Sequence, residues 1–132
     1  MDSYEVEIKM SVRDYECDIQ GVVNNSVYQN YLEHARHEYL KSIGVDFKEY
    51  SDKGINLSVI RVELDYKGAL TSGDNFTVTT TLQKESKIRV VFYQNIIRLS
   101  DTKLVLKGKV TGVALNAKGR PFMPEELEKI IR

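Results

Sequence analysis

The clearest pattern in the chain is a change of hydrophobic period close to its N-terminus. Over residues 5–13 apolar and polar side chains alternate, which predicts a strand with one buried face. From Ser26 the apolar residues recur at spacings of three and four, so we predict an amphipathic helix over 26–43. Ser26 and Gln29 fit a capping box at its start, and Gly44 can adopt the left-handed conformation that ends a helix.

Four further strand patterns follow this helix, after a polar connection that can hold a short helix. They cover residues 57–67, 74–86, 87–100 and 103–116. The third of them is apolar on both faces, so we expect it in the centre of a sheet. Turn residues at 71–74 and 100–101 predict that strands adjacent in sequence pair as antiparallel hairpins. A terminal helix is predicted from Pro124 to the end of the chain.

This order of elements predicts an α+β fold in a single domain, residues 1–132. One long helix and one curved antiparallel sheet of five strands each have an apolar face, and the two faces can be buried together. A chain of 132 residues is long enough for one such core. The outer face of the sheet stays partly apolar through Val91, Tyr93 and Ile97, so we expect self-association to cover it.

Charge and cysteine content exclude several classes of function. Lys plus Arg and Asp plus Glu both number 19, so the net charge is zero. Nucleic acids and membrane surfaces attract proteins with excess basic charge, so we expect neither as a partner. Cys17 is the only cysteine, which excludes an internal disulfide and a multi-cysteine metal site. An acidic start with no apolar run behind it predicts a cytoplasmic protein without a signal peptide or a membrane span.

The loop before the helix, "YECDIQGVVNN", contains residues suited to chemistry. A helix N-terminus presents unpaired N–H groups and a partial positive charge, so it can polarise a carbonyl oxygen. Asn24, Asn25 and Ser26 stand at that terminus, and Asp18 lies upstream with Gly21 between to let the backbone turn. A carboxylate beside a polarised carbonyl is the minimum for acyl-transfer hydrolysis. Asp, Gly and Asn also make ordinary turns, so spacing alone leaves a solvated connecting loop as the alternative.

The same loop and the helix behind it resemble a known signature. The run "YECDIQGVVNNSVYQNYLEHAR" is similar to that of hotdog-fold acyl-CoA thioesterases of the 4-hydroxybenzoyl-CoA thioesterase type. The matching residues are Glu16, Asp18, Gly21, Val23, Asn24, Asn25, Tyr28, Glu33, Ala35 and Arg36. The strand order and the TSGD turn at 71–74 also fit, so the resemblance covers most of the chain. It implies a hotdog fold, in which a long central helix is wrapped by a curved five-stranded antiparallel sheet.

The resemblance also implies roles for particular residues. In that family the second acid is the catalytic carboxylate, and a backbone N–H at the start of the central helix polarises the thioester; here these are Asp18 and Asn25. The implied substrate-binding residues are Gly21, Val23, Asn24, Tyr28, Lys87 and Arg89, the last two being basic residues that would meet the phosphates of coenzyme A. A solvated hairpin is the alternative for those two. No cofactor is implied, and the site is expected to be shared in a homodimer, which can pair into a tetramer.

Other residues receive structural interpretations. The loop lacks the histidines of some family members, so hydrolysis would depend on Asp18, as general base or as nucleophile. His34 and His37 have no further ligands at metal spacing, so no metal is predicted. Arg36 is expected to pair with Glu33 one turn back. The expected function is hydrolysis of an acyl-CoA thioester to free acid and coenzyme A. The alternative is a non-catalytic hotdog module that binds acyl-CoA or acyl-carrier protein.

Overall fold

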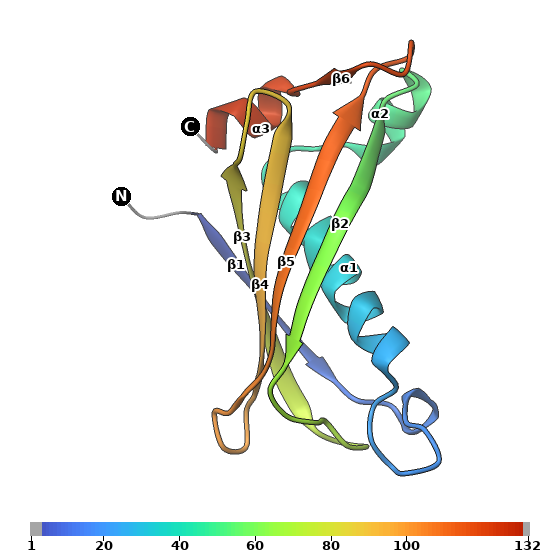
Figure 1. The fold of residues 1–132 in the computed structure, drawn as a ribbon, viewed down its shortest axis with the longest axis vertical. Coiled ribbons are helices and arrows are strands. Elements are labelled where there is room, and N and C mark those ends of the chain that lie inside the picture. The colour runs from blue at the N-terminus through green and yellow to red at the C-terminus, as the bar shows by residue number, and fades with distance from the viewer. Residues whose placement is uncertain (1–3, 131–132) are drawn as a thin grey trace.

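A computed structural model describes residues 4–130, and its elements follow the predicted order (Figure 1). They are β1 (Glu5–Ser11), the short 3-10 helix η1 (Asp14–Glu16), α1 (Asn25–Ser42), α2 (Phe47–Asp52), β2 (Asn56–Tyr66), β3 (Asn75–Lys84), β4 (Arg89–Arg98), β5 (Leu104–Leu115), β6 (Pro121–Phe122) and α3 (Glu125–Ile130). The predicted bounds of the long helix and the long strands are right to within two residues at each end. The final helix begins one residue after Pro124, and the last two residues predicted for it lie outside the described part.

The strands form one antiparallel sheet in the order β1-β3-β4-β5-β2, with the two-residue strand β6 added beside β5. The strand that is apolar on both faces, β4, is central as predicted, and β4 and β5 form a hairpin across residues 99–103. The hairpin predicted at 71–74 is wrong. The turn exists, but β3 pairs with β1 on one side and with β4 on the other, so it has no edge left for β2. Strand β2 pairs instead with β5 and forms the edge of the sheet opposite to β1. The connection over 67–74 therefore crosses the end of the sheet.

Helix α1 covers the inner face of the sheet and runs behind the strands in Figure 1. Its apolar positions face the strands, and six of its side chains are buried: Tyr28, Tyr31, Leu32, Ala35, Tyr39 and Leu40. They contribute to two core clusters, one beside the first half of the helix with Phe76 and Ile96, and one beside the second half with Phe92 and Val110. Helix and sheet thus hold each other in place by burying both apolar faces.

The ends of α1 differ in one respect from the prediction. Its N-cap is Asn24, whose side-chain oxygen accepts a hydrogen bond from the Ser26 N–H at 3.0 Å, so the predicted Ser26 capping box is wrong. Three cap-forming residues stand in succession here, and the first of them keeps the extended backbone that a cap requires. At the other end Gly44 adopts φ of +92°, as predicted for a residue that ends a helix.

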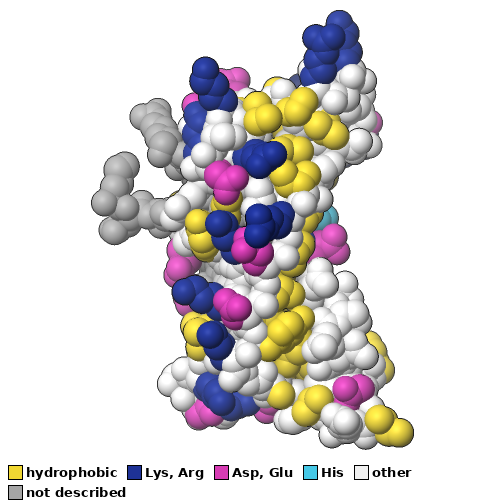
Figure 2. Space-filling model, in the orientation of Figure 1, with side chains coloured by type: hydrophobic (Ala, Val, Ile, Leu, Met, Phe, Trp, Pro, Cys, Tyr) yellow, Lys and Arg dark blue, Asp and Glu magenta, His cyan; other side chains and the backbone are white. Residues whose placement is uncertain are grey.

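The outer face and one edge of the sheet expose apolar side chains. Figure 2 views this outer face: charged side chains of both signs lie over the central strands, and apolar ones follow the β2 side. Of the residues expected on this face, Val91 is covered by its neighbours, whereas Tyr93 is exposed. Strand β2 is an edge strand and exposes Val59, Ile60 and Val62. Its free edge thus offers unpaired backbone groups flanked by apolar side chains.

Candidate active site

The loop between η1 and α1 folds back on itself as a tight turn. The Asp18 N–H donates to the Val22 carbonyl at 2.8 Å, and the Gly21 N–H donates to the Asp18 carbonyl at 2.9 Å. Gly21 adopts φ of +83°, a conformation that favours glycine, so the predicted turning point is confirmed. Cys17 and Val23 then pair as an isolated antiparallel bridge. Because bridge partners lie side by side, the turn brings Cys17 next to Val23, two residues before α1 begins, and leaves Asp18 opposite Val22.

Asp18 and Asn25 lie at the N-terminal end of α1, on either side of that bridge. The Asp18 side chain is exposed, and one carboxylate oxygen accepts a hydrogen bond from the Gln20 N–H at 2.8 Å. Asn25 is the first residue of α1. Within residues 4–130 its N–H has no hydrogen-bond partner, because the Asn24 cap accepts from the next residue instead. The loop before α1 therefore offers an exposed carboxylate, and the first residue of α1 offers an N–H donor with no partner among the described residues.

Glu16 fixes the loop at its base. One oxygen of its carboxylate accepts hydrogen bonds from the Tyr31 hydroxyl and from the Arg13 N–H, both at 2.8 Å, and its carbonyl accepts from the Asn24 N–H at 3.1 Å. Burial and the neighbouring Glu16 carboxylate raise the pKa of Tyr31 above its ordinary value, so its hydroxyl stays protonated and keeps donating. Glu16 is thus a positioning residue for the loop.

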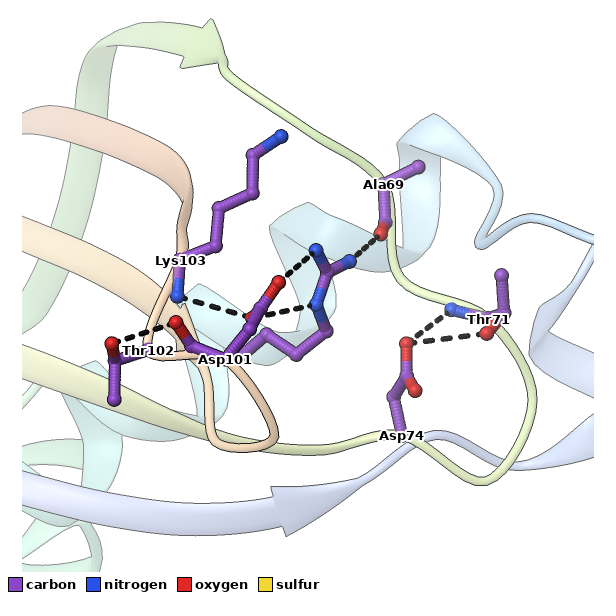
Figure 3. Close-up of polar contacts among 7 residues, drawn as sticks. Ala69, Thr71, Asp74, Asp101, Thr102 and Lys103 are labelled. Carbon is purple, nitrogen blue, oxygen red and sulfur yellow. Dashed lines mark hydrogen bonds and ion pairs between the residues drawn. The ribbon is translucent and has the colours of Figure 1, made fainter.

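The 67–74 connection supports the loop from the other side. The Val23 N–H donates to the Leu70 carbonyl at 2.9 Å, and Val22 forms a bridge with Thr71. The connection is held in turn by Arg98, which donates to the Ala69 carbonyl at 2.7 Å and to the Asp101 carboxylate at 2.8 Å (Figure 3). The Arg98 guanidinium lowers the pKa of Asp101 to about 2. Sequence reasoning missed this support, whose only local signal was an arginine three residues before an aspartate in a turn.

Two of the predicted substrate-binding residues belong to the core. Val23 is 3% exposed and Tyr28 is 2% exposed, and both pack in the cluster beside the first half of α1. The Tyr28 hydroxyl accepts a hydrogen bond from the Leu70 N–H at 3.0 Å, which ties the helix to the 67–74 connection. In the single chain these two residues therefore form a floor beneath the loop, whereas Gly21 and Asn24 are exposed on it.

The basic residues predicted to meet phosphates lie far from Asp18 within one chain. Lys87 and Arg89 are exposed at the β3–β4 turn. Strand β4 leads from Arg89 to Arg98, which contacts the connection beside the Asp18 loop, and these nine steps span about 30 Å. The two halves of the predicted site thus lie at opposite ends of the sheet, as the positions of the β3–β4 turn and the loop before α1 in Figure 1 also show.

A cavity of about 400 Å³ opens at the same end as Lys87 and Arg89. It lies between the second half of α1, α2, α3 and strands β2, β4 and β5. Most of its wall is apolar, including Leu40, Phe47, Val90, Phe92 and Leu127. Its polar wall on α1 consists of Glu33, Arg36 and His37. An apolar cavity with few polar groups is typical of a small-molecule site.

The ion pair predicted between Arg36 and Glu33 does not form within the described residues. The Arg36 guanidinium donates instead to the side-chain oxygen of Gln94 on β4 at 3.2 Å. Burial lowers the pKa of Arg36, and the nearby charge of Glu33 offsets this in part. The prediction failed because a helical spacing cannot reveal a buried glutamine on a distant strand.

The histidine on the wall of the cavity, His37, has a packing role. His37 stacks on Phe47, with ring centroids 4.8 Å apart. Over residues 4–130 no group of three or more His, Cys, Asp or Glu side chains is arranged to hold a metal ion. None of the helices in this part of the chain is long and apolar enough to cross a membrane. The loop at the start of α1 and the cavity are thus the two candidate parts of a site.

A long helix wrapped by an antiparallel sheet, with a carboxylate loop at the helix start, defines the hotdog class of thioesterase folds. The chain belongs to the thioesterase-like superfamily, whose family pattern matches residues 12–131. It is 42% identical over 115 residues to the acyl-acyl carrier protein thioesterase ATL2, chloroplastic, of Arabidopsis thaliana, covering 87% of this chain and 61% of that protein. The chain thus spans about 60% of the length of the first such relatives.

Two further comparisons agree with this assignment. A putative esterase of Synechocystis is 34% identical over 131 residues, which cover 94% of this chain and 79% of that protein. The crystal structure of a 1,4-dihydroxy-2-naphthoyl-CoA thioesterase from Synechocystis matches with a TM-score of 0.90 at 17% identity, covering 97% of this chain and 96% of that one. At this low identity the match concerns the fold, and it extends over almost the whole chain.

Proposed function

We propose that the protein is an acyl-CoA thioesterase, which hydrolyses the thioester to a free acid and coenzyme A. The observation that carries the proposal is the exposed Asp18 carboxylate in a turn that ends two residues before Asn25, whose N–H has no partner among the described residues. The family and the named activities of its members, which include acyl-CoA and acyl-carrier-protein thioesterases, support the same reaction.

The chemistry follows from these two groups. The Asn25 N–H, at the positive end of α1, would donate a hydrogen bond to the thioester oxygen and stabilise the negative charge that develops on it. Asp18 would take a proton from water as the water attacks the carbonyl carbon, or would attack that carbon itself. If Asp18 acts as the base, the carbon–sulfur bond then breaks and coenzyme A leaves as the thiol with the proton that Asp18 had taken up. If Asp18 attacks the carbon, coenzyme A leaves as the thiolate and is protonated by water, and a second water then hydrolyses the acyl–Asp18 anhydride to the free acid and the Asp18 carboxylate. No cofactor is needed in either form of the reaction.

We also propose that the complete site is shared by two chains. Along α1, Asn25 and Arg36 are eleven residues apart, which corresponds to about 16 Å, so the start of the helix lies well away from the cavity of its own chain. Antiparallel pairing of two β2 edges reverses the direction of the second helix. The start of one α1 would then lie near the second half of the other, where the cavity and Lys87 and Arg89 are found.

A cytoplasmic location remains a prediction from the sequence.

The residues of β2 favour one register for this pairing. If the two-fold axis passes through Val62, Arg61 faces the partner's Glu63 on the outer face, and the exposed Val62 side chains meet at the centre. The contact between Arg61 and Glu63 occurs twice by symmetry, and the contact between the two Val62 side chains occurs once, on the axis. The exposed outer face around Tyr93 would serve the second association, from dimer to tetramer.

The proposal is tested by thiol release. Short, long and aromatic acyl-CoAs and an acyl-carrier-protein thioester would be mixed with wild-type protein and with Asp18→Asn. Asp52→Asn, which alters an exposed carboxylate on α2 far from the loop, is the matched control. We expect Asp18→Asn to lose at least about a hundredfold in rate and Asp52→Asn to match wild type. Binding without turnover by wild type would establish the non-catalytic module instead, and an equally fast Asp18→Asn would refute the mechanism.

A further inference from the structure

We propose that Arg36 selects acyl groups that carry an oxygen, as a hydroxyl, an oxo group or a phenol, by hydrogen-bonding that oxygen inside the cavity. This inference rests on the proposed function, because it assigns the cavity to the acyl part of the thioester. It starts from the geometry around one side chain on β4, Gln94, which is fully buried within an apolar strand.

Gln94 is held in one orientation. Its amide nitrogen donates to the Leu32 carbonyl and to the Thr80 hydroxyl oxygen, both at 3.0 Å. A backbone carbonyl can only accept, so the amide nitrogen must face Leu32 and the amide oxygen must face the opposite way. That oxygen receives the Arg36 guanidinium at 3.2 Å. Gln94 is therefore a positioning residue that fixes Arg36 at the wall of the cavity.

One hydrogen bond does not satisfy Arg36. A guanidinium has five N–H donors, and Gln94 is its one hydrogen-bond acceptor among the described side chains and backbone groups. Burial also disfavours its charge, since the pKa of Arg36 is lowered. The opposite charge that acts on Arg36 is Glu33, which is exposed and makes no ion pair with it in the described part of the chain. The remaining donors are thus available to an oxygen in the cavity that Arg36 lines.

The rest of the cavity suits a carbon skeleton. Leu40, Phe92 and Leu127 line it with apolar surface, and its volume of about 400 Å³ lies in the range of small-molecule sites. A plain alkyl or phenyl group would fill this space, but it would displace water from Arg36 and offer no acceptor for the hydrogen bonds that the guanidinium donated to that water. A site with fixed polar groups discriminates strongly against an analogue that lacks the matching atom. An oxygenated acyl group meets both requirements at once.

The test compares thioesters that differ by one oxygen. For 3-hydroxyoctanoyl-CoA against octanoyl-CoA, and for 4-hydroxybenzoyl-CoA against benzoyl-CoA, the ratio of the two kcat/KM values would be measured. We expect wild type to favour the oxygenated member of at least one pair by about tenfold or more. Arg36→Met should bring that ratio close to one while octanoyl-CoA is still hydrolysed, and Arg36→Lys should retain part of the preference. Arg120→Met, at an exposed arginine outside the cavity, is the matched control.

A binding measurement separates this inference from the proposed function. Calorimetric titration of the same thioesters into Asp18→Asn, with and without Arg36→Met, reports selection even if no variant hydrolyses them. Tighter binding of the oxygenated member that disappears with Arg36→Met would support the inference, whatever the outcome for hydrolysis. Equal values of kcat/KM and of Kd for both members of both pairs, or a preference that survives Arg36→Met in a folded protein, would overturn it.

Discussion

The turn that carries Asp18 needs a glycine because of the backbone conformation there, and not because a side chain would lack room. Gly21 has φ of +83°, and a Cβ added there would meet no atom within 4 Å. Gly119, in the turn before β6, has φ of +77° and is equally open. The two glycines thus face the same steric cost on substitution, although only one of them lies beside the proposed catalytic carboxylate.

Gly21→Ala and Gly119→Ala are therefore a matched pair. Each should lower the free energy of unfolding by about 1 kcal/mol, because a left-handed backbone disfavours any side chain. In urea unfolding the two variants should behave alike. Only Gly21→Ala should slow thioester hydrolysis, since its turn sets the place of Asp18. Equal activities for the two variants would show that the turn has no part in the reaction.

Burial of Tyr39 makes the free energy of unfolding depend on pH in the alkaline range. Burial raises the pKa of Tyr39 to about 12, compared with about 10 in an unfolded chain. The group binds its proton more tightly when folded, so its contribution to stability is complete below pH 10 and is lost as the pH rises towards 12. Tyr39→Phe should flatten the fall of the unfolding free energy above pH 10.

At the residue level the sequence indicated the loop far better than the cavity. Asp18, Gly21 and Asn25 are close in sequence, and a turn followed by a helix places them by local geometry alone. The contact of Arg36 with Gln94 joins residues 58 positions apart, on two elements whose packing no local pattern encodes. The sequence did contain one signal that was not used, which is a glutamine in the middle of an apolar strand.

Among the elements, α1 matters most, because it provides the core, the N–H donor and one wall of the cavity. Its period of three and four made it predictable to within one residue at each end. Its cap was misassigned because Asn24, Asn25 and Ser26 are all good capping residues, and only the backbone angles decide between them. The hairpin at 71–74 failed for a related reason: the turn is a local feature, but the partner of each strand is set by the whole sheet.

Removal of the α1 cap should affect both stability and activity. Asn24→Ala deletes the acceptor of the Ser26 N–H, and we expect a loss of about 1 kcal/mol in the free energy of unfolding. Fraying of the first turn should also misplace the Asn25 N–H and lower kcat for thioester hydrolysis. The control is Asp46→Ala, which removes the equivalent cap from α2. If only stability changes in Asn24→Ala, the Asn25 N–H is not the group that stabilises the oxyanion.

On the scale of the whole molecule, the proposed dimer joins two chains through the outer edges of their β2 strands. The proposed register sets Arg61 opposite the partner's Glu63, so a charge reversal at either position creates two like-charge contacts per dimer. Arg61→Glu and Glu63→Arg should each weaken the dimer by about tenfold in Kd, and the double reversal should restore it. Sedimentation velocity measures this, with Lys118→Glu in the distant turn as control. A double variant weaker than both single variants would refute the register.

The separation along α1 between the start of the helix and the cavity has a consequence for mixtures of two variants. If every site takes its carboxylate from one chain and its acyl cavity from the other, a chain with a defective carboxylate and a chain with a defective cavity can complement each other in a mixed dimer. In an equal mixture of exchanging Asp18→Asn and Arg36→Met chains, half of the dimers combine both types, and about a quarter of all sites receive two intact halves. Hydrolysis of the oxygenated thioester should then exceed the average of the two separate proteins. Sites built within single chains would show no such complementation.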